Sequence, residues 1–256
     1  MKSKFRVDRL GMILMICGLI FFGNTVKAQD LKIKNVVLVH GAFASRSGWQ
    51  DVYKILKKQG YNVTVVQIPL TSLNDDVNAV NCALDRLDGK AVLVGHSWSG
   101  TVITVAGVHP NVASLVYVDA FQPDEGETTL QWVQSAPALP ESGLLPPDTN
   151  GFVYFDKEKF HVGFAADLSK EEAQFMADSQ QPIAASCFAD VISTAAWHNK
   201  PSYGILGTAD KSINPEILRA MYKRSGAKIT EIKGASHVVF ISHAKEVARV
   251  IHSATI

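Results

Sequence analysis

A serine flanked by small residues is the strongest chemical signal in the sequence. The segment VGHSWSG places Ser97 between Gly95 and Ser99, directly after the apolar run 91–95 and before a helix-forming stretch. A strand-to-helix turn of this kind exposes a serine hydroxyl, and the small residues give the sharp turn room to pack. The helix that follows directs its positive N-terminal end toward the same place, which favours a nearby oxyanion. The pattern predicts that Ser97 is a nucleophile.

A serine hydroxyl is a weak nucleophile until a positioned base takes its proton. His237 is the leading candidate, because its segment GASHV lies between the last predicted strand and the last predicted helix. His243, at the start of that helix, is the second candidate. His96 is adjacent to Ser97 in the chain, so its side chain should point away from the nucleophile. We therefore predict that His237 is the base.

An acid is needed to orient the imidazole and to stabilise its charged form. Asp210, in the segment GTADKS, follows the predicted strand 202–206. The chain order Ser, Asp, His is one of the orders in which such triads occur. Asp119, directly after the apolar run 114–118, is the alternative acid. Asp210 is the predicted member of the triad, and Asp119 remains open as its rival.

The segment HGAF at residues 40–43 follows the first strong apolar run. Backbone N–H groups of this loop would lie across from Ser97 and would complete an oxyanion hole with the N–H of Trp98. Because main chain supplies the donors, residue identity matters mainly through the room that Gly41 provides. We assign His40 a structural role, bonding to loop backbone, and no part in proton transfer.

The elements that must position these residues follow a regular order. Strands are predicted at 34–40, 62–68, 91–95, 114–118, 202–206 and 228–232, and helices at 49–59, 75–87, 98–108 and 244–252. Continuous apolar strands separated by helices indicate a mostly parallel sheet with helices on both faces, which is an α/β fold. Residues 123–196 interrupt this order with several prolines and helical patches such as 169–178. Because so long a stretch is not a plain connection, we predict a mainly helical cap over the carboxyl edge of the sheet.

The first 28 residues have the features of a secretory signal peptide. Lys2, Lys4, Arg6 and Arg9 precede the apolar run 10–22, and small residues precede a cleavage site after Ala28. Thirteen apolar residues are too few to span a bilayer, so a retained anchor helix is the weaker alternative. We expect a secreted or periplasmic protein with no stable membrane insertion, whose mature part, residues 29–256, is one domain.

Composition narrows the choice of partners and cofactors. A net charge of +1 with 47% hydrophobic residues gives no reason to expect a nucleic-acid or anionic-membrane partner. The two cysteines beyond the signal, Cys82 and Cys187, could pair in an oxidising compartment or remain free thiols. No cysteine or histidine cluster has zinc-like spacing, so no metal is indicated.

Taken together, these segments resemble the α/β-hydrolase superfamily over nearly the whole mature chain: VVLVHGAF, VLVGHSWSG, LVYVDAF, GTADKSINPE and GASH. Within it, QIPLTSLNDDV and DAFQPDEGE resemble bacterial carboxylesterases related to the plant methylesterase and hydroxynitrile lyase group. The resemblance implies an α/β-hydrolase fold and hydrolysis of a small-molecule ester without a cofactor, through an acyl-enzyme on Ser97. It also implies oxyanion donors at Ala42 and Trp98, with Phe43 as a neighbour.

Departures from relatives narrow the expected chemistry. Dehalogenases and epoxide hydrolases of this fold have an aspartate nucleophile and dienelactone hydrolases a cysteine, where this chain has Ser97. Hydroxynitrile lyases carry a lysine after the catalytic histidine and a threonine after the first loop's histidine. Here these positions are Val238 and Gly41, so cyanohydrin cleavage is not expected. Hydrolysis of lactone, amide or carbon–carbon bonds, and a non-catalytic ligand-binding role, remain as alternatives.

Overall fold

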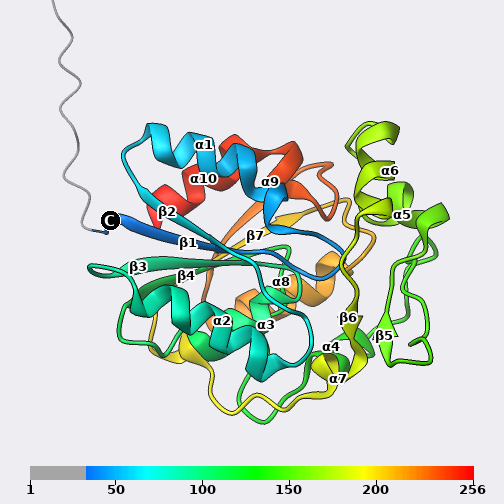
Figure 1. Ribbon diagram of the computed structural model, residues 1–256, viewed down its shortest axis with the longest axis horizontal. Coiled ribbons are helices and arrows are strands. Elements are labelled where there is room, and N and C mark those ends of the chain that lie inside the picture. Colours follow the sequence, from blue (N-terminus) through cyan, green and yellow to red (C-terminus); the bar gives the residue numbers. More distant parts are fainter. Residues whose placement is uncertain (1–32) are drawn as a thin grey trace, which may run out of the picture. The chain divides into compact units, whose positions relative to one another are not determined.

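The computed structural model describes residues 33–256, and the predicted signal peptide with its cleavage after Ala28 lies outside them. Its centre is a six-stranded sheet in the order β2-β1-β3-β4-β7-β8, in which every pairing is parallel (Figure 1). The strands are β1 Asn35–Val39, β2 Asn62–Val66, β3 Ala91–His96, β4 Val112–Val118, β7 Ser202–Gly207 and β8 Lys228–Ile232. All six predicted strands are present, with bounds that differ by at most two residues.

Burial explains why the central strands are continuous apolar runs. Every residue of β1, β3 and β7 is buried, because helices cover both faces of the sheet. The edge strands β2 and β8 are more polar and partly exposed. The mostly parallel α/β architecture predicted from the sequence is confirmed.

The larger helices form two layers. In Figure 1, α1 and α10 lie together on one face of the sheet and α2 and α3 on the other. The main helices are α1 Gln50–Lys58, α2 Leu73–Asp85, α3 Ser99–Ala106, α8 Pro215–Ser225, α9 Val239–Ser242 and α10 Ala244–Ser253. A short 3-10 helix, η1 (Arg46–Trp49), precedes α1. Local signals set their ends: the Ser72 side chain caps α2, and α8 begins with Pro215 and ends at the left-handed Gly226.

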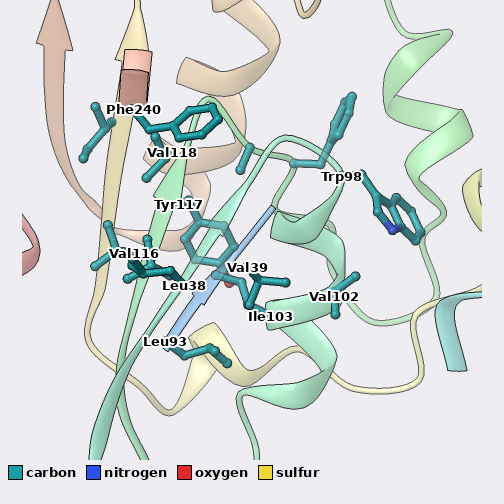
Figure 2. Close-up of a cluster of buried hydrophobic side chains, with 14 of the residues drawn as sticks. Leu38, Val39, Leu93, Trp98, Val102, Ile103, Val116, Tyr117, Val118 and Phe240 are labelled. Carbon is teal, nitrogen blue, oxygen red and sulfur yellow. The ribbon is translucent and has the colours of Figure 1, made fainter. Parts of the chain in front are cut away.

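The core between the sheet and α3 holds the chain segment that carries Ser97. Figure 2 shows Val39 of β1 and Leu93 of β3 on the side of the sheet that faces Val102 and Ile103 of α3, all fully buried. Each such side chain contributes about 1.5–3 kcal/mol through removal from water. The junction between β3 and α3 is therefore held on both sides by well-packed elements.

The segment between β4 and β7 forms the cap, which lies beyond the carboxyl ends of the strands (Figure 1). It contains α4 Thr129–Val133, α5 Lys157–Gly163, α6 Lys170–Asp178, α7 Ala185–Ala189 and the 3-10 helix η2 Ala196–His198. It also contains an antiparallel pair, β5 Phe152–Val153 and β6 Ile183–Ala184, which the sequence did not predict. The cap belongs to the same compact unit as the sheet.

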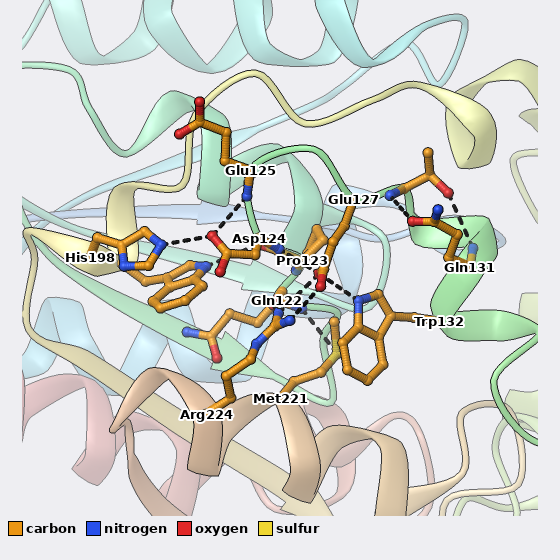
Figure 3. A network of polar contacts seen from close by, with 12 residues as sticks. Gln122, Pro123, Asp124, Glu125, Glu127, Gln131, Trp132, His198, Met221 and Arg224 are labelled. Atoms are coloured by element: carbon orange, nitrogen blue, oxygen red, sulfur yellow. Dashed lines mark hydrogen bonds and ion pairs between the residues drawn. The ribbon is translucent and has the colours of Figure 1, made fainter.

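A polar network fastens the base of the cap to α8 (Figure 3). Glu127 accepts hydrogen bonds from Arg224 of α8 and from the Trp132 indole, the latter at 2.7 Å. The guanidinium of Arg224 also stacks on Trp132 and on Trp197, 4.9 and 5.6 Å from the ring centroids. The backbone of Ile192, near the end of the cap, pairs with Glu127 at its beginning. The two ends of the cap are thus joined to each other and to the main domain.

The two cysteines are apart: Cys82 is exposed on α2 and Cys187 is buried in α7, and both are free. Within residues 33–256, no helix is both long and apolar enough to cross a membrane. In the same part of the chain, no three His, Cys, Asp or Glu side chains are grouped as a metal site.

Candidate active site

Ser97 lies at the sharp turn between β3 and α3. Its backbone is in the left-handed region, with φ of 55°, which is uncommon for a residue other than glycine. Gly95 allows this turn, because a Cβ at that position would lie 2.6 Å from the carbonyl oxygen of Ser99. Backbone strain of this kind clusters at functional sites.

The structure brings the three predicted triad residues together. The Nε2 atom of His237 lies 2.9 Å from the Oγ of Ser97, and its Nδ1 atom lies 2.7 Å from Oδ2 of Asp210. His237 and Asp210 are buried, and Ser97 retains 8% exposure. With Nδ1–H donating to the carboxylate, the Nε2 lone pair is free to accept the Ser97 proton.

Two tightly packed loops hold the base and the acid. The other oxygen of Asp210 accepts hydrogen bonds from the backbone N–H groups of Ser212 and Ile213, at 2.8 and 3.0 Å, which fixes the carboxylate. The loop that carries His237 packs against the end of β7, where a Cβ on Gly207 would lie 2.5 Å from the Ala235 carbonyl oxygen. The acid therefore reaches the imidazole from a rigid loop.

The two predicted oxyanion donors, Ala42 and Trp98, line the same cavity as Ser97. Among the described residues, the N–H groups of Ala42 and Trp98 have no acceptor. Phe43 differs, because its N–H donates to the carbonyl of Gln181 in the cap at 2.9 Å. Phe43 was predicted as a neighbour of the donors in the oxyanion hole, and the engagement of its N–H favours Ala42 and Trp98 as the donors.

The loop that carries Ala42 is fastened to the turn at Ser97. The Ser99 hydroxyl donates to the carbonyl of His40, which gives a structural reason for serine where glycine is usual. His40 accepts the N–H of Ile68 at 3.2 Å and donates to the Gly41 carbonyl at 2.9 Å. Burial lowers the pKa of His40 to about 4, so the ring is neutral. These contacts fit the structural role expected for His40.

The rival histidines are engaged elsewhere. His96 donates to the backbone carbonyl of His237 at 3.0 Å, and burial lowers its pKa well below the usual value. His243 lies at the start of α10, with a partly exposed side chain that bonds to Ser242 at 2.9 Å. Neither ring contacts Ser97, so the geometry favours His237 as the base.

The rival acid, Asp119, is completely buried behind the triad. Its Oδ1 atom accepts the N–H of Gly207 at 2.7 Å, and its Oδ2 atom has no partner among the described residues. Burial, reinforced by the charge of Asp210, raises the pKa of Asp119 well above the usual range. Burial thus favours the neutral form of this carboxyl, and Asp119 makes no hydrogen bond to His237, so the geometry favours Asp210 as the partner of the base.

Sequence reasoning missed a second buried carboxylate beside the site. Asp76 of α2 accepts the Trp98 indole N–H and the Leu70 backbone N–H, both at 2.7 Å. Burial raises the pKa of Asp76 to about 6. The helix was expected to begin at residue 75, whereas α2 begins at Leu73, and Asp76 lies in its first turn. Asp76 fixes the side chain of Trp98, whose backbone N–H is one of the predicted oxyanion donors.

A cavity of about 290 Å³ opens at Ser97 between the sheet and the cap. None of its lining residues, all within the described part of the chain, carries a charge. Its aromatic lining comes from both the main domain and the cap: Phe43, Trp98, Phe121, Phe155 and Phe188. Its polar side chains are those of Ser97, Ser142, Ser212 and Asn214. Such an apolar cavity, with few polar groups near a nucleophile, is typical of a small-molecule site.

Comparison with known proteins agrees with this geometry. Residues 36–250 match the family model described as the alpha/beta hydrolase family. The chain belongs to this family. Membership confirms the resemblance found in the sequence.

Two of the relatives are enzymes by name. The chain is 29% identical over 181 residues to the carbendazim hydrolyzing esterase of Nocardioides sp. (strain SG-4G), a match that spans 65% of this chain and 66% of that one. It is 24% identical over 255 residues to norfluorocurarine synthase 2 of Strychnos sp, spanning 87% of this chain and 95% of that one.

Solved structures share the fold. The crystal structure of polyneuridine aldehyde esterase, a protein of Rauvolfia serpentina, superimposes with a TM-score of 0.75 at 21% identity. The alignment covers 86% of this chain and 98% of the other. At this identity the likeness shows the α/β-hydrolase fold and leaves substrate and activity to be argued from the site.

Proposed function

We propose that the protein is a serine hydrolase that cleaves small, uncharged carboxylic esters through an acyl-enzyme intermediate on Ser97. The observation that carries this proposal is the hydrogen-bonded chain from Ser97 through His237 to Asp210 at the mouth of an apolar cavity. The esterase names among the relatives support ester hydrolysis over the other reactions of the same triad.

The proposed mechanism has two half-reactions, acylation and deacylation, that use the same groups. The Ser97 Oγ attacks the ester carbonyl while His237 Nε2 takes its proton, and the Ala42 and Trp98 N–H groups stabilise the oxyanion. The tetrahedral intermediate collapses, the carbon–oxygen bond to the alcohol breaks, and His237 returns the proton to the leaving alkoxide. Water then repeats the attack on the acyl-enzyme and releases the acid. Asp210 keeps Nδ1–H directed and stabilises the imidazolium.

The cavity supports an uncharged substrate. No charged side chain among the described residues lines it, and burying an unpaired charge in an apolar cavity is strongly unfavourable. Its volume of about 290 Å³ lies at the small end of ligand sites. We therefore expect short aliphatic or single-ring esters to be hydrolysed faster than esters with an acidic acyl group.

Turnover of p-nitrophenyl esters tests the proposal. Wild-type protein should hydrolyse p-nitrophenyl butyrate, and it should hydrolyse the negatively charged p-nitrophenyl hemisuccinate at least tenfold more slowly. Ser97→Ala should lose at least a thousandfold in kcat. Ser253→Ala is the matched control, because this exposed serine at the end of α10 bonds only to the Arg249 carbonyl. Turnover that survives Ser97→Ala, or an inert wild type, contradicts the proposal, and the second result favours a ligand-binding role.

We also propose that the protein is exported, on the charged, apolar and small-residue regions of its first 28 residues. Expression of the full chain in a bacterial host, followed by N-terminal sequencing of the periplasmic fraction, tests this. A mature N-terminus at Gln29 is the expected result, and an uncleaved protein in the cytosolic or membrane fraction contradicts it.

A further inference from the structure

We propose that Asp167 of the cap is a positioning residue for His237, so that the seating of the cap and the placement of the base are coupled. This inference rests on the serine hydrolase function proposed above. Asp167 lies in the loop between α5 and α6, far from His237 in the sequence. Its carboxylate accepts hydrogen bonds from both the backbone N–H and the hydroxyl of Ser236, at 2.9 and 2.5 Å.

The same carboxylate reaches the other side of the base. Asp167 accepts a third hydrogen bond, at 2.8 Å, from the hydroxyl of Ser242 in α9. Ser236 and Ser242 flank the short segment that carries His237 and Val238, so one cap side chain holds both ends of that segment. The His243 ring is a titratable neighbour of this contact, with its Nδ1 atom 3.8 Å from Asp167. Three hydrogen bonds to a carboxylate are strong because the acceptor is charged.

A second contact from the same cap segment reaches His237 itself. The ring of Phe164 lies edge-on to the imidazole, with centroids 4.8 Å apart. Phe164 is almost fully buried and also contacts Phe43, on the loop that carries the oxyanion donor Ala42. The cap segment 164–167 therefore touches the base loop and the oxyanion loop together. Movement of this segment displaces the imidazole relative to Ser97.

Two substitutions of Asp167 separate the effect of its hydrogen-bond geometry from the effect of its charge. All three groups that meet Asp167 donate to it, so alanine leaves the Ser236 N–H and hydroxyl without this acceptor and leaves the Ser242 hydroxyl only its contacts with His243 and Val238. Asparagine keeps one oxygen for the Ser236 N–H and Ser242, and its amide can donate to the Ser236 hydroxyl, which accepts as well as donates. Asp167→Asn should therefore keep the geometry that Asp167→Ala loses.

Steady-state kinetics on p-nitrophenyl butyrate test the inference with four proteins: wild type, Asp167→Ala, Asp167→Asn and Asp178→Ala. Small misplacement of a reacting group costs about one to two orders of magnitude in rate. We expect Asp167→Ala to lower kcat at least tenfold with KM within about twofold, and Asp167→Asn to retain at least a third of wild-type kcat. Asp178→Ala is the control, since this exposed cap carboxylate contacts only Lys157 and Gln174.

Several results overturn the inference. These are a wild-type kcat in Asp167→Ala, a loss expressed in KM alone, or an equal fall in Asp167→Ala and Asp167→Asn. If Asp167→Ala does not fold, Ser236→Ala and Ser242→Ala are compared. Ser236 is adjacent to His237 in the chain, so kcat should fall further in Ser236→Ala than in Ser242→Ala. A wild-type kcat in both variants refutes the coupling. Inert wild-type protein contradicts the proposed function instead, so the two failures are distinguishable.

Discussion

Gly41→Ala is the sharpest test of the site's geometry, because Gly41 lies where the loop 40–43 contacts the turn at Ser97. A Cβ at Gly41 would lie 2.7 Å from the Cβ of Ser97, 2.8 Å from the His96 carbonyl oxygen and 3.0 Å from the His96 Nδ1 atom. Two of these atoms belong to the buried turn, which α3 and the central strands hold in place. The added methyl group therefore displaces the loop, not the turn.

The size of the effect follows from the distances. A first contact at 2.7 Å requires the loop to retreat by at least 0.3 Å to reach 3.0 Å, the shortest contact a Cβ normally makes, and by 0.7 Å to reach ordinary contact at 3.4 Å. The retreat carries the N–H of Ala42, one of two unengaged donors, away from the oxyanion. Loss of one such donor costs about 100- to 1000-fold in kcat, or about 3–4 kcal/mol of transition-state stabilisation. We expect kcat of Gly41→Ala to fall at least 100-fold while KM changes little.

Initial-rate assays with p-nitrophenyl butyrate measure kcat and KM. Thermal unfolding monitored by circular dichroism shows whether the variant is folded. Gly89→Ala is the matched control, because a Cβ there meets nothing closer than 3.9 Å. The control should keep wild-type kcat. A folded Gly41→Ala protein with kcat within threefold of wild type refutes the reasoning, because the Ala42 N–H would then have no part in stabilising the oxyanion.

Three further predictions follow from buried polar contacts. Ser99→Ala removes the hydroxyl that holds the His40 carbonyl, and urea unfolding should show a loss of about 1–3 kcal/mol. Asp119→Asn should flatten the pH dependence of stability. In wild type the unfolded Asp119 ionises above its ordinary pKa of 3.8 while the folded one stays neutral, so stability falls by about 1.4 kcal/mol per pH unit up to the folded pKa. Glu127→Gln weakens the half-buried pair with Arg224 and should cost about 1 kcal/mol in the same unfolding assay.

Each of these has a contrary outcome. Wild-type stability in Ser99→Ala would show that the hydroxyl does not tie the two loops together. Parallel stability curves for wild type and Asp119→Asn between pH 4.5 and 7 would show that the folded Asp119 is ionised. An unchanged urea midpoint in Glu127→Gln would show that the Arg224 pair at the base of the cap is not stabilising.

The central sheet could be predicted from the sequence because burial on both faces requires its strands to be continuous apolar runs. Strands covered on both faces must be apolar throughout, and runs such as 91–95 are unmistakable for that reason. The triad followed from the same logic. Ser97, Asp210 and His237 each come after a strand of one parallel sheet, and the carboxyl ends of such strands meet at one edge.

Contacts that depend on the cap were beyond sequence reasoning. The engagement of the Phe43 N–H requires the Gln181 carbonyl, and a backbone acceptor so far along the chain has no local signature. Asp76 was missed for a different reason, because only the fold places this residue of α2 against Trp98. The two-residue strands β5 and β6 are too short to produce an alternating pattern.

The most direct test of the central claim is mass spectrometry of the protein after reaction with a fluorophosphonate probe. The probe phosphonylates a serine only where a base and an oxyanion hole activate it, so it reports on nucleophile, base and donors together. The account predicts a single adduct, mapped by peptide analysis to Ser97 and absent in His237→Ala. An unlabelled wild-type protein, or an adduct on any other residue, would contradict it.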